Sequence, residues 1–208
     1  MSALELAAYG VAIAYVAGFL ALSSALARSS DQPVWLFDNG SPRQFVPALL
    51  FRLSFAGAVL WPLGTTIFGS AFSADPLSGL LGGNAPDVVG FVLVLAGVCL
   101  ALFAQGYMGA SWRIGTAEDH VGPIVDGGPF AISRNPVFVG QALLFGGLFI
   151  AKPSIVQAGL TVSALYAIAL QVRIEEGVLL KALGEPYRAY CARVGRWIGY
   201  RSQQSGNM

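Results

Sequence analysis

Two segments of this chain combine glycine, proline and charged side chains in patterns that suit the binding of a small charged ligand. The first begins at Gly127-Gly128 and leads through Arg134-Asn135-Pro136 into an apolar run. Glycine lets the backbone approach a ligand closely. Pro136 suits the first turn of a helix, whose free amide groups attract an anion. The local pattern alone also fits a tight turn whose Arg134 binds a lipid phosphate.

The second segment places two neighbouring carboxylates, Glu175 and Glu176, at the end of an apolar run. Neighbouring helical residues point about 100° apart, so the two cannot share one role, and Glu176 is expected to pair with Arg173. Gly184 should end this helix and Pro186 should begin a short amphipathic one. A solvated glutamate pair is the simpler alternative, although an ionisable residue at the end of a membrane span also marks functional sites. The short helix is expected to turn Tyr187, Tyr190, Val194 and Trp197 toward the bilayer.

Helices in a bilayer must position both segments. The 208 residues are 55% hydrophobic and 11% charged, whereas soluble domains carry about 25% charged residues. A net charge of +1 offers no basic surface for nucleic acid. Apolar stretches approach the roughly 20 residues that cross a bilayer; they run from about Leu4 to Ala27, Val46 to Phe72, Val88 to Met108, and through both arms of a hairpin within Val137 to Gln171.

The predicted fold is therefore all-α: a polytopic membrane protein of about five transmembrane helices, with a C-terminal helical hairpin and cytoplasmic amphipathic helices. Lys152-Pro153 interrupts the hairpin. We expect Lys152 to reach outward to the interface and Pro153 to begin the second arm. Residues 1–87 form an N-terminal part with the first two spans and an external loop, and residues 88–208 form the functional core.

The cationic side chains predict an orientation. Of the 12 Lys and Arg residues, all but Lys152 fall in segments on one side of these spans. By the positive-inside rule the N-terminus lies outside and the C-terminus is cytoplasmic, in the inner or plasma membrane if the source is bacterial. Cys99 and Cys191 show neither metal-ligand spacing nor a disulfide framework. His120 is expected to be a solvated loop residue, so no metal site is predicted.

Taken together, these segments resemble the isoprenylcysteine carboxyl methyltransferase family, which is related to membrane phospholipid N-methyltransferases. The resemblance covers about Gln105 to Ile198. It implies S-adenosylmethionine as cofactor, bound in the cytoplasmic C-terminal half, and a lipophilic acceptor that enters from the bilayer. Its elements are Gly109 to Gly115, Gly128 to Gly140, Glu175-Glu176, Gly184 to Tyr190 and Arg193 to Trp197.

One position departs from this pattern. Many relatives have a histidine where this chain has Asn135, so general-base catalysis by a histidine is excluded there, although Asn135 can still position the cofactor by hydrogen bonds. The resemblance implies that Arg173 and Glu176 act near the methyl acceptor. The residues expected to contact the cofactor are Gly128, Pro129, Phe130, Ser133, Arg134, Asn135, Pro136, Val137, Glu175, Glu176, Tyr187 and Tyr190.

The acceptor stays open at this point. The resemblance favours carboxylate O-methylation; a carboxylate is already ionised at neutral pH, and Arg173 could orient it. A lipid amine or a small thiol is the alternative. Two other classes remain: a membrane reductase with a nicotinamide cofactor, and a noncatalytic membrane component. Membrane lipids are expected partners, nucleic acid is not, and the sequence does not indicate an oligomeric state.

Overall fold

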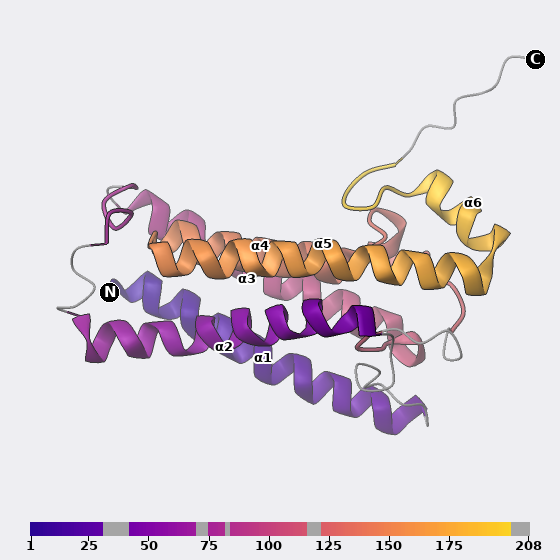
Figure 1. The fold of residues 1–208 in the computed structure, drawn as a ribbon, viewed down its shortest axis with the longest axis horizontal. Helices are drawn as coiled ribbons and strands as arrows, with labels where there is room; N and C mark the ends of the chain where they lie inside the picture. The colour runs from indigo at the N-terminus through magenta and orange to yellow at the C-terminus, as the bar shows by residue number, and fades with distance from the viewer. Residues whose placement is uncertain (31–41, 70–74, 82–83, 116–121, 201–208) are drawn as a thin grey trace, which may run out of the picture.

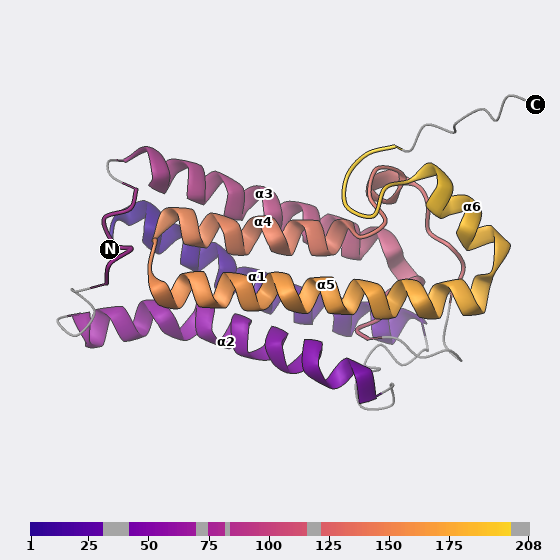
Figure 2. The ribbon, with the colours of Figure 1, turned by 45° about the horizontal axis from the view of Figure 1, so that its top comes forward.

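Long antiparallel helices form a bundle in the computed structural model (Figures 1 and 2). The structure describes residues 1–30, 42–69, 75–81, 84–115 and 122–200. The prediction that concerns His120 lies outside these ranges. Among the described residues the regular secondary structure is helical, apart from isolated bridges such as that between Val194 and Tyr200. The long helices are α1 (Ala3–Ser30), α2 (Phe45–Ile67), α3 (Ala85–Met108), α4 (Pro136–Ala151) and α5 (Ile155–Leu183), followed by α6 (Glu185–Arg193).

These helices confirm an all-α polytopic membrane protein. Within the described residues, α1, α2, α3 and α5 are long and apolar enough to cross a membrane, and α4 is a shorter apolar helix. The four long helices and the shorter α4, which is the first arm of the predicted hairpin, agree with about five apolar helices. The predicted second span was too long, since α2 ends at Ile67 and Gly69 follows it closely.

Helices α3 and α4 lie side by side because glycines remove the side chains between them (Figure 2). A Cβ atom on Gly140 would lie 2.5 Å from the carbonyl oxygen of Gly97, and one on Gly147 would lie 2.7 Å from that of Gly90. The two backbones therefore touch directly, as small residues allow in membrane bundles. This contact fixes the start of α4 against the end of α3.

Buried polar pairs connect the remaining helices. Gln105 of α3 donates to Ser23 of α1 at 2.8 Å, and the Trp112 indole donates to the same hydroxyl at 3.1 Å. Tyr9 of α1 donates to Gln157 of α5 at 3.0 Å. Each pair satisfies hydrogen-bonding groups that lipid could not satisfy. Because a pair forms only when its two helices are adjacent, the pairs specify which helices are neighbours.

The hairpin between α4 and α5 differs in detail from the prediction. Lys152 does not extend freely to the interface but pairs with Glu5 of α1 at 3.3 Å. Helix α5 begins at Ile155, after Ser154, whose hydroxyl accepts from the Gln157 amide at 3.0 Å. The serine caps the free amide groups of the first turn, which Pro153 cannot do.

The short helix α6 also faces a different environment from the one predicted. Gly184 ends α5 with a φ of 56°, as expected. Tyr187, Tyr190 and Val194 are buried together against Leu179, Leu183 and Ile124, and they do not face the bilayer. Trp197 is the exposed member of the predicted set.

Candidate functional site

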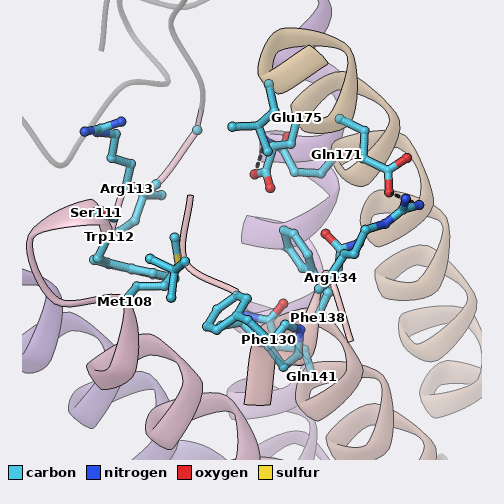
Figure 3. A pocket seen from close by; sticks show the side chains of 18 of the residues that line it. Met108, Ser111, Trp112, Arg113, Phe130, Arg134, Phe138, Gln141, Gln171 and Glu175 are labelled. Carbon is cyan, nitrogen blue, oxygen red and sulfur yellow. Dashed lines mark hydrogen bonds and ion pairs between the residues drawn. The ribbon is translucent and has the colours of Figure 1, made fainter. Parts of the chain in front are cut away.

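A cavity of about 380 Å³ lies at the end of the bundle where α1, α3 and α5 end and α2 and α4 begin. Its walls come from the long helices, from α6 and from the two loop segments around α3 and α4. Figure 3 shows Met108 and Trp112 on one side of the cavity and Gln171 and Glu175 of α5 on another. Segments far apart in the sequence therefore build one site.

Glu175 presents a carboxylate to this cavity. Its Oε1 accepts from Nε2 of Gln171 at 2.9 Å, and among the described residues Glu175 forms no ion pair. The other amide atom, Oε1 of Gln171, is buried and has no partner in the described chain. A carboxylate without a protein cation, beside an unsatisfied acceptor, favours a ligand that carries a cation or hydrogen-bond donors.

Glu176 is held by two arginines. Arg134 Nη2 lies 2.9 Å from Oε1, and Arg196 Nη2 lies 2.6 Å from Oε2. The hydrogen bonds to Glu176 raise the pKa of Arg196. The predicted partner Arg173 is exposed and lies outside the cavity lining. The local pairing was therefore wrong, because the loop before α4 and the segment after α6 bring two other guanidinium groups to this carboxylate.

The turn before α4 is fixed from several directions. The Tyr190 hydroxyl donates to the carbonyl oxygen of Phe130 at 2.7 Å. Asn135 Nδ2 donates to the Arg196 carbonyl at 3.0 Å, and the Asn135 amide donates to Ser133 Oγ at 3.0 Å. Burial raises the pKa of Tyr190, so its hydroxyl stays protonated and can donate. This arrangement holds Phe130 and Asn135 at the cavity wall.

Arg113 is a cavity residue to which the sequence analysis gave no role. It directly follows Trp112, on a different wall from Glu175 (Figure 3). Its Nε is buried without a partner in the described chain, and burial lowers the pKa of its guanidinium. A partly desolvated cation that has no carboxylate partner in the described part of the chain is a candidate site for an anionic group. The sequence did contain a signal for this residue, because Arg113 lies in Gly109 to Gly115, one of the segments on which the family resemblance depends.

The other part of the cavity is apolar and comes mainly from α1, α2 and α4. Phe51 of α2 stacks on Phe138 of α4 with ring centroids 6.0 Å apart, and Phe55 meets Phe145 edge-on at 5.0 Å. Gln141 donates to the Tyr15 hydroxyl at 2.8 Å, and its own buried Oε1 has no partner among the residues that the structure describes. The sequence analysis assigned no chemistry to α1 and α2, because apolar runs show no site until they are packed.

The structure thus divides the predicted site residues into two groups. Arg173, Gly128, Pro129 and Ser133 lie outside the lining. Gly128 packs on the ring of Tyr107 with a φ of 53°, so its conformational freedom serves the turn. The predicted residues that line the cavity are Phe130, Arg134, Asn135, Pro136, Val137, Glu175, Glu176, Tyr187 and Tyr190.

Comparison with known proteins adds a family to this geometry. Residues 86–186 match the phospholipid methyltransferase family. A solved structure of a eukaryotic intramembrane Ras methyltransferase, isoprenylcysteine carboxyl methyltransferase, is 23% identical over 77% of this chain, with a TM-score of 0.47. The chain spans 55% of that protein's length. Among curated proteins, none matched.

The matched segment contains α3, α4, α5 and the start of α6, and so carries Arg113, Arg134, Glu175 and Glu176. It confirms the relationship to membrane phospholipid methyltransferases that the sequence indicated. Through this segment, just under half of its length, the chain is similar to the phospholipid methyltransferase family, and its long apolar helices are those of a membrane protein.

Proposed function

We propose that this protein transfers a methyl group from S-adenosylmethionine to a lipophilic acceptor. The observation that carries the proposal is Glu175, a cavity carboxylate without an ion-pair partner among the described residues. The cofactor bears a sulfonium and an ammonium cation, and a carboxylate in a site shielded from water interacts strongly with either. Glu176 cannot serve in the same way, since Arg134 and Arg196 already neutralise it.

The residues around Glu175 fit such a cofactor. The carboxylate of the cofactor would find donors in the first-turn amide groups of α4, where Val137 and Phe138 line the cavity. The unpartnered Oε1 of Gln171 would accept from an ammonium or hydroxyl group. Phe130 and Tyr187 offer aromatic surface for the adenine ring. When bound, the cofactor supplies an activated methyl group.

The acceptor would occupy the apolar part of the cavity, between Phe19, Phe51, Phe55 and Phe138. We favour a carboxylate acceptor, because Arg113 lines the same cavity and has no carboxylate partner among the described residues. Arg113 takes the orienting role that the sequence assigned to Arg173, which is exposed. In this reaction a bond forms between the acceptor oxygen and the methyl carbon, and the bond between that carbon and sulfur breaks.

The protein's part in an in-line displacement is to hold two reactants in line and to exclude water. The clamp of Arg134 and Arg196 on Glu176 fixes the turn before α4 relative to α5. The aromatic side chains of α2 and α4 separate the cavity from lipid on that side. No proton transfer is needed for a carboxylate acceptor, which agrees with the absence of a histidine at position 135.

Calorimetry on the detergent-solubilised protein tests this function. We expect saturable heat with S-adenosylmethionine and none with a nicotinamide dinucleotide. The reverse result would favour a membrane reductase, and no heat with either would favour a noncatalytic component. A screen of dodecanoic acid, dodecylamine and dodecanethiol with methyl-labelled cofactor then identifies the acceptor class. Transfer to the amine or thiol alone would overturn the carboxylate proposal while leaving the methyltransferase proposal intact.

A further inference from the structure

The chain continues past α6 as a short strap, Val194–Tyr200, that lies beyond the residues matched to the family. In Figures 1 and 2 the yellow segment after α6 turns back toward the bundle before the chain leaves it. The strap is closed by the bridge between Val194 and Tyr200 and by a hydrogen bond of 2.7 Å from the Gly195 amide to the Gly199 carbonyl. Gly199 has a φ of 112°, a conformation that side chains disfavour.

The strap is fastened to the turn that starts α4. The Arg134 amide donates to the Gly195 carbonyl at 3.0 Å, and the Gly199 amide donates to the Ile132 carbonyl at 2.9 Å. Asn135 Nδ2 donates to the Arg196 carbonyl at 3.0 Å. The strap and the turn therefore lie at the same depth along the bundle.

Helix lengths place that depth near the edge of a bilayer. Lys152 and Glu5 pair at the far end of α4 and mark one polar boundary. The 16 residues of α4 span only about 24 Å, less than the roughly 30 Å of hydrocarbon. Along α5, Glu176 lies about 32 Å from Ile155 at the same rise per residue. The strap, held to both elements, is therefore level with the membrane interface.

At this level the strap exposes apolar side chains. The relative exposure is 42% for Trp197, 72% for Ile198 and 73% for Tyr200, and the neighbouring Ile132 is 47% exposed. The polar groups of the strap have protein partners instead: Arg196, although partly exposed, pairs with Glu176, and the backbone bonds to the turn. Irregular backbone is tolerated at membrane depth only where protein satisfies it, and tryptophan and tyrosine favour the interface.

We propose that the strap is an interfacial membrane element, which inserts Ile132, Trp197, Ile198 and Tyr200 among the lipid headgroups. The partner of this surface is the bilayer itself. The surface lies at the level where the spanning helices reach the membrane interface, and its Trp and Tyr side chains are typical of that interface. By covering the backbone of the Ile132 to Asn135 turn, the strap also shields the polar wall of the cavity from lipid. This inference does not depend on which ligand the cavity binds.

Spin-label accessibility in lipid nanodiscs tests the proposal. A nitroxide is attached at Ile198→Cys in a chain that also carries Cys99→Ala and Cys191→Ala. Oxygen, which partitions into lipid, should relax this label more than a water-soluble nickel chelate does. The matched control is Arg188→Cys on α6, a position with a side-chain exposure of 63%, where the nickel chelate should dominate.

Two results would overturn the proposal. Dominant nickel accessibility at position 198 would place the strap in water, and low accessibility to both reagents would mean that protein, such as a second copy, covers it. Quenching by bromine-labelled lipids gives a second measurement if the label disturbs the strap. The unlabelled chain should lose a lipid-quenched component of its fluorescence on Trp197→Phe. Equal quenching of both proteins would contradict an interfacial Trp197.

Discussion

Glu175 and Glu176 are neighbours in the chain but differ in their surroundings. Among the described residues Glu175 has one hydrogen-bond partner, the Gln171 amide, whereas Glu176 bridges Arg134 and Arg196. The first is available to a ligand cation, and the second positions the turn before α4. Substitution by glutamine keeps the shape of each side chain and removes its charge, so the two variants separate the two roles.

For Glu175→Gln we expect S-adenosylmethionine to bind about tenfold more weakly, because a charge-assisted interaction worth about 1.5 kcal/mol is lost. Calorimetry with S-adenosylhomocysteine, which lacks the sulfonium charge, locates the contact. A loss confined to S-adenosylmethionine indicates the sulfonium, and an equal loss indicates the ammonium group. Unchanged affinity for both ligands would remove Glu175 from the site.

For Glu176→Gln we expect weaker binding of both ligands by a similar factor, on the order of three- to tenfold, since the variant loosens the turn instead of removing a direct contact. The thermal midpoint in detergent should also fall, because Arg134 would be left partly buried without its carboxylate. Cofactor affinity identical to that of the wild type would show that the clamp does not position the site.

For Arg113→Gln we expect the KM of a carboxylate acceptor such as dodecanoic acid to rise about tenfold, because a charge-assisted hydrogen bond is lost. The cofactor dissociation constant should change little. Arg173→Gln is the matched control, and its KM should stay near the wild-type value because Arg173 is exposed. The opposite ranking of the two variants would restore Arg173 as the orienting residue.

At the scale of helices, the α3–α4 contact positions the start of α4 at the cavity. Gly146 and Gly147 are adjacent in α4 but face different surroundings. A Cβ on Gly147 meets the Gly90 carbonyl oxygen at 2.7 Å, whereas one on Gly146 meets nothing within 4 Å. The same substitution at the two positions therefore isolates the helix contact from helix propensity.

Gly147→Ala should destabilise the protein by about 1–3 kcal/mol, because the added methyl group forces the two backbones apart. Gly146→Ala should be neutral or stabilising by about 0.5–1 kcal/mol, since alanine favours the helix. Unfolding by denaturant in a fixed detergent compares the two. Equal effects would mean that α3 and α4 are not in backbone contact.

At the scale of the whole molecule, the N-terminus lies at the end of the bundle opposite α6 and the strap (Figure 1), and residues of α6 line the cavity. The positive-inside count predicts that the cavity end is cytoplasmic. A membrane-impermeant thiol reagent should therefore label Ser2→Cys in intact cells, in a chain lacking Cys99 and Cys191. Arg188→Cys should react only after the cells are opened. The reverse pattern would invert the proposed orientation.

The sequence by itself determined the helical membrane fold, the Gly184 break between α5 and α6, and much of the polar lining. These features follow from hydropathy and local backbone preference, which depend on neighbouring residues alone. It also indicated the family, through segments that keep their order along the chain.

Only the tertiary structure decided which charges are paired and which are free. Glu176 pairs with Arg134 and Arg196, which are 42 and 20 residues away in the sequence. It does not pair with the neighbouring Arg173, because folding brings the two distant guanidinium groups closer to it. Arg113 and the aromatic side chains of α1 and α2 join the site for the same reason. Pairing and burial depend on which helices meet, and that is set by the glycine contacts and buried polar pairs of the bundle.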